Sequence, residues 1–195
     1  MSKDSGKQKT HDPQQWLAEY GDYLFRFALF RLSDNEIAKD MVQETLIAAW
    51  KAKKNFRGDS SLRTWLVGIM KHKITDHIRK EIRGRKLSDA LEHDPTSSMF
   101  DQNDHWAKPV QGWEDDPERL CSNQQFLKAL HHCVAALPEQ HRNVFTLREL
   151  NGEDTDSICN ALDISSTNLH VIMHRARLAL RQCLEKNWFG NGKDE

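Results

Sequence analysis

Proline, glycine and long apolar runs are scarce in this chain. Its 195 residues include five prolines and nine glycines, and alternating strand-like patterns are nearly absent, so helices are expected to dominate. No run approaches the roughly 18 apolar residues that a membrane-spanning helix needs, and the first ten residues lack the apolar segment of a secretory signal. The four cysteines are scattered, which argues against a disulfide framework. We therefore expect an all-α, cytoplasmic protein with no direct membrane insertion.

The net charge is also close to zero, because 28 basic residues are balanced by 29 acidic residues. The charges are nevertheless unevenly placed: residues 51–86 hold 12 basic and 3 acidic side chains, whereas residues 87–119 hold 2 and 9. A dense basic block is an electrostatic footprint for a polyanion such as nucleic acid. A solvated helix face has the same composition, so charge alone leaves both interpretations open.

Residues 87–121 differ in composition from the sequence on either side. They are rich in Asp, Asn, Ser and Pro, and no apolar period survives there, which is typical of a linker. The predicted fold is therefore two small helical domains, residues 1–86 and 122–195, joined by a flexible acidic linker over residues 87–121.

Three helices are expected in the N-terminal domain, each beginning at a residue that can cap its first turn. Glu36 follows the second of these residues at the spacing of a capping box, and the third helix is expected to end near Arg83. The capping residues are Asp12, Ser33, and Ser60 or Ser61. The apolar residues expected to be buried are Trp16, Leu17, Tyr20, Tyr23, Leu24 and Phe27 in the first helix, Ile37, Met41, Leu46, Ala49 and Trp50 in the second, and Leu62, Leu66, Ile69, Met70, Ile74, Ile78 and Ile82 in the third.

The third helix combines its apolar stripe with a basic, hydrogen-bonding side. A helix built in this way can pack on a domain with one face and lie against DNA with the other. The residues expected on the polar side are Lys71, Thr75, Arg79 and Arg83, spaced four apart, with His72, Asp76 and Lys80 beside them.

The C-terminal domain is expected to hold four helices. The first begins near Ser122 and the second after Pro138, and Asp154 is a good N-cap for a short third helix. After a turn at residues 163–165, a final helix runs over residues 166–184. Two helices joined by a tight turn form a helix-turn-helix, whose second helix enters the DNA major groove, although such pairs also occur in helical proteins that bind no DNA. The residues expected to point inward are Phe126, Leu130, Cys133, Val134 and Leu137 in the first helix, Ile158 and Leu162 in the third, and Leu169, Ile172, Met173, Ala176 and Leu180 in the last.

Two blocks of the sequence carry a family resemblance. The first comprises Asp40-Met41-Val42-Gln43-Glu44-Thr45, Trp50, and the run from Phe56 to Leu66 (FRGDSSLRTWL); it resembles the second conserved region of bacterial sigma factors. The second comprises Leu137-Pro138, Leu147-Arg148-Glu149-Leu150 and His174-Arg175-Ala176-Arg177; it resembles the fourth region. No third-region domain fits between them, so the chain is similar to the compact extracytoplasmic-function (ECF) group.

The resemblance implies a sigma factor that binds core RNA polymerase and directs promoter-specific transcription initiation in response to a signal. It implies no enzyme activity, cofactor or small-molecule substrate, because the polymerase performs the chemistry, and it implies an anti-sigma factor as a further partner. The core-binding residues would be Asp40, Gln43 and Glu44. The residues at the minus-ten element would be Phe56, Arg57, Gly58, Asp59, Ser60, Ser61, Lys71, His72, Lys73, Asp76, Arg79, Lys80 and Arg83. Those at the minus-thirty-five element would be Thr167, Asn168, His170, Val171, His174, Arg175 and Arg177.

The last helix departs from the family pattern. A basic residue is common where His170 stands and an arginine where Ile172 stands, and neutral histidine attracts phosphate little near pH 7. We expect a weaker or differently specified upstream contact, with Arg175 and Arg177 supplying most of the charge. Asp163 replaces a turn glycine, but aspartate tolerates the left-handed conformation better than most residues.

Alternative interpretations stay open at this point. One is a sigma-mimicking regulator that sequesters an anti-sigma factor without binding DNA. Another is a metal-sensing or hydrolytic helical protein, but the candidate cluster of His131, His132, Cys133 and Cys121 lacks the paired spacing of a zinc site. No pairing of a nucleophile with a base is evident, so we expect neither a metal nor a catalytic site. The acidic linker could occupy a basic channel of the polymerase or act only as a solubilising tether.

Overall fold

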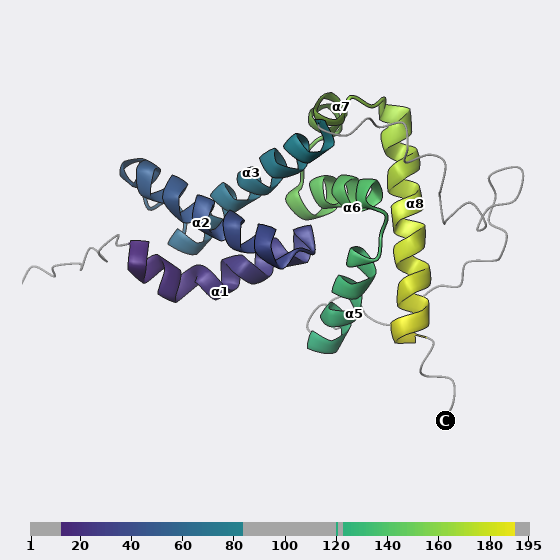
Figure 1. Cartoon of the computed structure of the whole chain (residues 1–195), viewed down its shortest axis with the longest axis horizontal. Helices are drawn as coiled ribbons and strands as arrows, with labels where there is room; N and C mark the ends of the chain where they lie inside the picture. The colour runs from purple at the N-terminus through teal and green to yellow at the C-terminus, as the bar shows by residue number, and fades with distance from the viewer. Residues whose placement is uncertain (1–12, 84–119, 121–122, 190–195) are drawn as a thin grey trace, which may run out of the picture. The chain divides into compact units, whose positions relative to one another are not determined.

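The computed structural model describes residues 13–83, residue 120 and residues 123–189, and every regular element among them is helical (Figure 1). The chain divides into two compact units, residues 1–77 and 78–195, with the boundary inside one helix. The all-α prediction is therefore confirmed. The expected N-cap at Asp12, the helix start at Ser122 and the predicted linker, apart from Leu120, lie outside the described residues.

The N-terminal unit is a three-helix arrangement that buries a shared apolar core. Its helices are α1 (Pro13–Leu32), α2 (Asn35–Ala52) and α3 (Leu62–Arg83), with a short 3₁₀ turn at Lys53–Asn55. The buried residues are Trp16, Leu24 and Ala28 on α1, Ala38, Met41, Val42, Leu46 and Ala49 on α2, and Leu66, Met70, Ile74 and Ile78 on α3. Burial of these faces, rather than helix propensity, supplies most of the stability of such short helices.

The start of α2 differs from the prediction. Asp34, not Ser33, is the N-cap: its Oδ1 accepts hydrogen bonds from the backbone N–H groups of Glu36 and Ile37, both at 2.9 Å. Ser33 instead has a left-handed backbone (φ 57°), and its N–H closes α1 by donating to the Leu29 carbonyl at 2.8 Å. The capping box on Ser33 is therefore wrong, because a carboxylate one residue later takes both free N–H groups.

The start of α3 decides between Ser60 and Ser61 as the N-cap of this helix. Ser61 Oγ accepts a hydrogen bond from the Thr64 N–H at 3.1 Å, so Ser61 rather than Ser60 caps the helix.

For four residues of this unit, the structure reverses the predicted burial or exposure. Leu17, Tyr23 and Trp50 were expected in the core but are exposed, whereas Thr75, expected on the polar side of α3, is buried. Two of the exposed rings are covered by cations instead: Arg63 lies 3.7 Å from the Tyr23 ring centroid and Lys53 Nζ lies 3.3 Å from that of Trp50. A cation over an aromatic face is favourable, so these rings have a partner without being buried.

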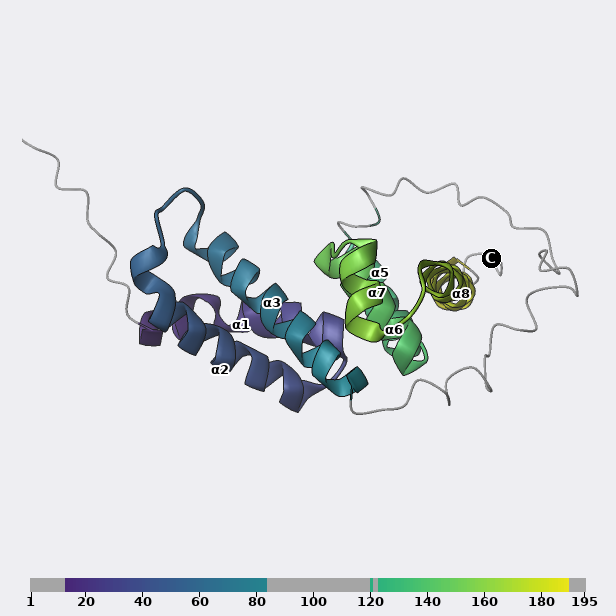
Figure 2. The ribbon, with the colours of Figure 1, turned by 90° about the horizontal axis from the view of Figure 1, so that it is seen from above.

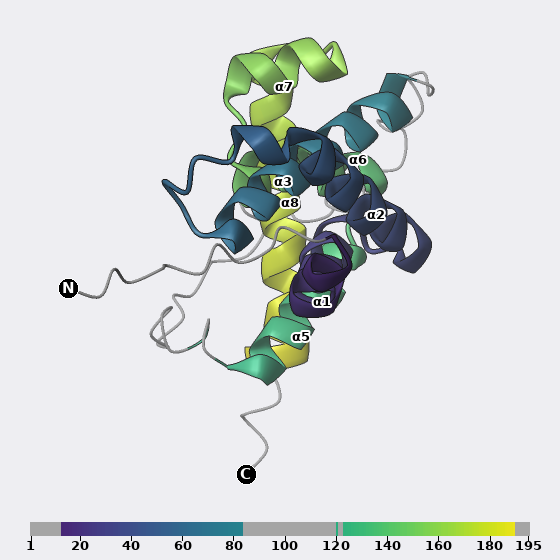
Figure 3. The ribbon, with the colours of Figure 1, turned by 90° about the vertical axis from the view of Figure 1, so that its left-hand side faces the viewer.

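The C-terminal unit is built around one long helix. Its elements are α5 (Gln124–Ala135), α6 (Glu139–Phe145) continued by a π-helical turn at Thr146–Asn151, α7 (Thr155–Leu162), and α8 (Ser166–Leu184) continued by a π-helical turn at Glu185–Phe189. Figures 1 and 3 show α7 at the N-terminal end of α8 and α5 beside its C-terminal half. The residues predicted to point inward from α7 and α8 are all buried, as are Phe126, Cys133, Val134 and Leu137, whereas Leu130 is partly buried.

Side-chain caps fix the beginnings of these helices. Asn123 caps α5, with Oδ1 accepting from the Gln125 N–H at 2.8 Å. Asp154 caps α7 as predicted, with Oδ1 accepting from the Ser157 N–H at 2.7 Å. Ser165 caps α8, with Oγ accepting from the Asn168 N–H at 3.1 Å. Each cap satisfies donors that the first turn of a helix leaves without a backbone partner.

A disulfide joins α5 to α8. Cys133 and Cys183 are bonded across a sequence separation of 50 residues, with their Cα atoms 5.6 Å apart. The sequence argued against a disulfide framework and did not anticipate this single bond, because only the folded unit brings the two helices together. Cys159 on α7 is free and half-buried.

Candidate nucleic-acid interface

The exposed face of α2 carries the three residues predicted to bind core polymerase. Asp40, Gln43 and Glu44 are all exposed, and their spacing of three and four residues places them on one face of the helix. Ile47 continues this face, and its side chain is 55 % exposed. Sequence reasoning missed Ile47, although its spacing of four residues from Gln43 could have identified it.

An ion pair connects this face to α3. Lys73 Nζ lies 3.1 Å from Glu44 Oε2. Lys73 was predicted to contact DNA and Glu44 to contact polymerase, so the structure brings together members of two predicted sites. Pairing with Glu44 offsets part of the charge that Lys73 offers to a phosphate.

The loop between α2 and α3 lies at one end of the N-terminal unit (Figure 2). Arg57, Gly58, Asp59 and Ser60 are exposed there, so their polar groups are accessible to a ligand. Gly58 has a left-handed backbone (φ 81°), and a Cβ at this position would meet nothing within 4 Å. Glycine is therefore required here by the backbone conformation and not by crowding.

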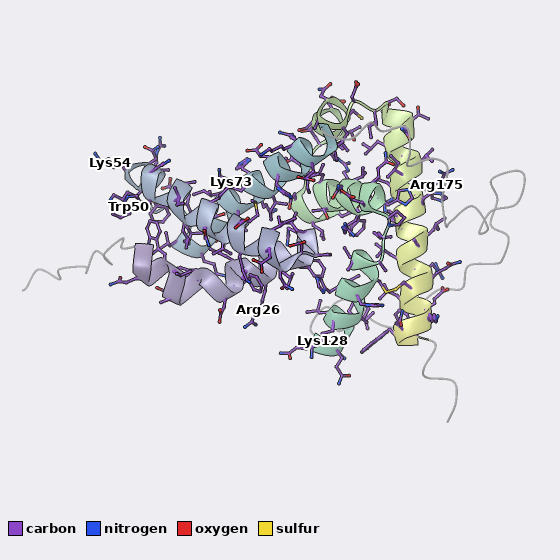
Figure 4. All side chains as sticks on the ribbon, in the orientation of Figure 1. Arg26, Trp50, Lys54, Lys73, Lys128 and Arg175 are labelled. Atoms are coloured by element: carbon purple, nitrogen blue, oxygen red, sulfur yellow. A yellow bond between two sulfur atoms is a disulfide. The ribbon has the colours of Figure 1, made fainter. Side chains whose placement is uncertain are left out.

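Aromatic rings support this loop from within. The Phe56 ring centroid lies 5.1 Å from that of Trp65, which in turn lies 6.4 Å from that of Trp16 in an edge-on contact. This arrangement favours packing of the Phe56 ring beneath the loop over stacking of the ring on a base. Trp65 itself is only partly buried. Figure 4 shows Trp50 and Lys54 projecting from the same end of the unit.

The polar side of α3 exposes both hydrogen-bond donors and acceptors to solvent. His72, Asp76 and Lys80 are exposed at intervals of four residues, and Lys71 is half-buried beside them. Arg79 lies on the same helix, and Arg83 ends it with a side chain outside the described residues. The helix thus buries Leu66, Met70 and Ile74 on one side while exposing donors and acceptors on another.

The pair of helices α7 and α8 forms the predicted helix-turn-helix. The turn contains Asp163 in the left-handed conformation, with φ 54° and ψ 47°, as its aspartate side chain allows. In α8 the predicted groove-facing residues are Thr167, His170, Val171, His174 and Arg177, which are exposed, and Asn168 and Arg175, which are half-exposed. The buried residues of α8 alternate with these, so one side of the helix anchors it and the other is presented to solvent.

One of the arginines on α8 already has an acidic partner. Arg177 Nη2 donates to Glu149 Oε1 at 2.5 Å. Both side chains are well exposed, so the pair contributes little stability, but it holds the guanidinium in one place and offsets its charge. The positive charge on this helix is therefore smaller than the sequence alone indicated.

Replacing Asp163 with glycine is expected to stabilise the C-terminal unit by about 0.5–1 kcal/mol, because glycine adopts a left-handed backbone without steric cost. Asp156→Gly in the first turn of α7 is the matched control, and it is expected to destabilise by a similar amount. Thermal melting monitored by circular dichroism measures both changes. Equal destabilisation by the two substitutions would contradict the role assigned to the turn.

Burial affects one cation of the N-terminal unit, Arg31 on α1. It lowers the pKa of Arg31 to about 10, so the side chain stays charged near neutral pH. The guanidinium stacks 3.4 Å from the Phe27 ring centroid.

Among the described residues, no group of three or more His, Cys, Asp or Glu side chains is arranged to hold a metal ion. No helix in this part of the chain is both long and apolar enough to cross a membrane.

Comparison with known proteins gives matches along most of the chain. Residues 16–84 match the profile described as sigma-70 region 2, and residues 127–180 match that of sigma-70 region 4. The chain is similar to a solved structure, the sigma factor RpoE in complex with the anti-sigma factor NepR from Bartonella quintana, with 24% identity, a TM-score of 0.39, and 88% and 96% of the two chains covered.

Curated relatives agree with the profiles. A "Probable RNA polymerase sigma factor" of Haemophilus influenzae is 30% identical over 164 residues, which cover 84% of each chain. The ECF RNA polymerase sigma-E factor of Salmonella typhimurium is 28% identical over 141 residues, which cover 72% of this chain and 70% of that protein. The chain therefore belongs to the sigma-70 family of RNA polymerase sigma factors, within its extracytoplasmic-function group.

Proposed function

We propose that this sigma factor aims core RNA polymerase at promoters by placing its two units on two separate promoter elements. The N-terminal unit takes the minus-ten element and helps to open it, and the C-terminal unit reads the minus-thirty-five element as duplex. The observation that carries the proposal is the division of α8: Leu169, Ile172 and Met173 are buried, while His170, Val171 and His174 are exposed beside them. A recognition helix needs this division, because one side must be held rigidly while the other meets base edges.

In the N-terminal unit, the exposed loop and the polar side of α3 supply two kinds of contact. Asp59 and Ser60 offer hydrogen-bonding groups to an unstacked base, whose extrusion costs a few kcal/mol. Lys71, Arg79 and Lys80 are suited to phosphates, which give affinity without sequence information. We assign His72 and Asp76 to base edges, since both are exposed between these cations.

The polymerase, not this chain, performs the chemistry in this proposal, so the chain is no enzyme and acts in the cytoplasm, where the polymerase is. A protein inhibitor, an anti-sigma factor, is proposed as a further partner on the strength of family membership. The domains are proposed to be residues 1–86 and 122–195, with residues 87–121 as the linker; the family profiles end and begin close to these limits, at residues 84 and 127.

The exposed face of α2 is proposed to bind the polymerase. The double variant Asp40→Ala, Gln43→Ala is expected to weaken core binding at least tenfold, because interface residues of this kind each contribute on the order of 1 kcal/mol. Glu44 is left in place because its loss would also free Lys73. Asp22→Ala on α1 is the control, and native gel titration against core polymerase is the measurement. Equal affinity of wild type and double variant would exclude this face.

Reconstitution with core polymerase and a promoter library tests the function as a whole. Transcripts starting from one class of sequence, and lost when His170, Val171 and His174 are all alanine, are the expected result. Core binding without any promoter output would contradict the proposal and favour a sigma mimic. A library selected identically by wild type and by the triple variant would remove α8 from upstream recognition.

A further inference from the structure

The bond between Cys133 and Cys183 lies in the core of the C-terminal unit, between α5 and the C-terminal end of α8 (Figure 4). The same core contains Phe126, Leu180 and Leu184. The opposite end of α8 carries the exposed residues proposed to read DNA. A single covalent bond therefore fixes the C-terminal end of the recognition helix, α8, to α5.

The two sulfur-bearing residues differ in accessibility. Cys133 is 1 % exposed, whereas Cys183 is only half-buried. Asn187 Nδ2 lies 3.3 Å from the Sγ of Cys183 and donates to the Cys183 backbone carbonyl at 2.8 Å. Cys183 is thus the more exposed residue of the pair, and we assign it as the cysteine that a small reagent attacks first, with Cys133 as the resolving partner.

A disulfide is unusual for a protein that works beside RNA polymerase. The cytoplasm keeps thiols reduced, and the disulfides found there are usually transient, catalytic or redox-sensing. We propose that Cys133 and Cys183 form a reversible thiol–disulfide switch that locks α5 to α8 and strengthens upstream DNA binding when the cytoplasm becomes oxidising. The proposal rests on the proposed function for the cellular compartment and for the DNA readout.

The chemistry balances with a small disulfide, such as oxidised glutathione, as the oxidant. The Cys183 thiolate attacks one of its sulfurs, so that a mixed disulfide forms and one glutathione thiolate leaves. The Cys133 thiolate then attacks Sγ of Cys183, the protein disulfide forms, and the second glutathione thiolate leaves. The two cysteines lose two protons and two electrons, and the glutathione disulfide gains them. Reduction reverses these steps, starting with attack at the accessible Cys183.

The bond should matter because it closes a long loop. Cross-linking residues 50 apart removes conformational freedom from the unfolded chain, and this stabilisation grows with loop length. For a loop of this size the expected effect of reduction is a rise of roughly 100- to 1000-fold in the unfolding constant of the unit, and a melting temperature lower by about 15–30 °C for a domain of this size. Without the bond, α8 loses its covalent link to α5 at this end.

The experiment compares the full-length chain with and without the bond. Cys121→Ser, Cys159→Ser serves as the background, so that only the pair remains, and Cys133→Ala, Cys183→Ala in that background is the thiol-free control. Proteins are equilibrated in glutathione buffers of increasing oxidised fraction, alkylated, and weighed by mass spectrometry. Melting curves and affinity for duplex minus-thirty-five DNA, selected beforehand with oxidised protein and core polymerase, are measured in the same buffers.

We expect the pair to be reduced in excess reduced glutathione and bonded in excess oxidised glutathione, with the melting shift above and at least tenfold weaker DNA binding when reduced. The thiol-free control should respond to neither buffer. A pair that stays bonded in excess reduced glutathione, or never bonds, overturns the switch, and so do equal melting temperatures or equal DNA affinities of the two states. If no promoter DNA can be selected in either state, the proposed function fails and the melting shift alone decides whether the switch exists.

Discussion

Replacing Leu24 with alanine is expected to cost the N-terminal unit about 2–5 kcal/mol of folding free energy. The Leu24 side chain is fully buried (0 % exposed) on α1, so its truncation removes apolar burial and leaves a cavity that the packed helices cannot fill. A unit of this size is stable by only about 3–8 kcal/mol. The variant should therefore be largely or partly unfolded in this unit, and urea titration monitored by circular dichroism measures the loss.

Leu17→Ala is the matched control for this experiment. It is the same substitution on the same helix, but Leu17 is 55 % exposed, and surface substitutions usually change stability by less than about 0.5 kcal/mol. The difference between the two variants isolates burial, because both exchange the same side chain within one helix. Comparable losses at the two positions would mean that the face of α1 assigned to the core is wrong.

Substituting Lys71, Arg79 and Lys80 together with alanine is expected to weaken promoter binding by the sigma–polymerase complex about 100-fold at 0.15 M salt. Each phosphate contact contributes about 0.9 to the slope of log affinity against log salt on duplex and about 0.7 on single strands. Loss of three contacts should therefore flatten that slope by about 2–3. Lys73 is left unchanged, because its ammonium group is paired with Glu44 at 3.1 Å.

The control for this variant removes the same formal charge elsewhere. Arg26, Lys39 and Lys128 are exposed on α1, α2 and α5 and belong to no proposed DNA surface, so their triple alanine variant should keep the salt slope. Filter binding or fluorescence anisotropy over 50–300 mM salt measures both variants. An unchanged slope in the α3 variant would remove this helix from the DNA-facing role, and an equal change in both variants would reduce the effect to net charge.

Much of the fold could be predicted from local sequence rules. The helix-turn-helix was predictable because Asp154 and Ser165 cap its two helices, and because the apolar residues of α8 recur at one helical period. Such signals act within a few residues, and the sequence contains them in full. The end of α1 was less predictable, because Ser33 and Asp34 are both good caps and only the path of the chain decides between them.

Features that depend on contacts between distant segments could not be read in this way. Tyr23 and Trp50 have the period of a core residue, yet Arg63 and Lys53 provide each ring with a cation partner at the surface. The link between Cys133 and Cys183 joins two helices 50 residues apart. Neither residue has a neighbouring cysteine that would have indicated the pair.

The proposed site was predictable to a similar extent. Its residue identities came from the family resemblance, and helical spacing placed Asp40, Gln43 and Glu44 on one exposed face. Pairings such as those of Lys73 with Glu44 and Arg177 with Glu149 were not predictable, because each joins different segments of a folded unit. Charge counted along the sequence therefore overestimates the charge that the folded surface can offer to DNA.

Because α8 is one continuous helix, a tilt at one of its ends displaces the other end. It is one helix from Ser166 to Leu184, so His170 stands about 20 Å along the axis from Cys183 at 1.5 Å per residue. A tilt of about 5° at the clamped end would swing the other end by roughly 2 Å, which is more than the tolerance of a hydrogen bond. Substitutions in the core around the disulfide-linked end of α8 should therefore alter which DNA bases are preferred, even though none of these core residues reaches the groove.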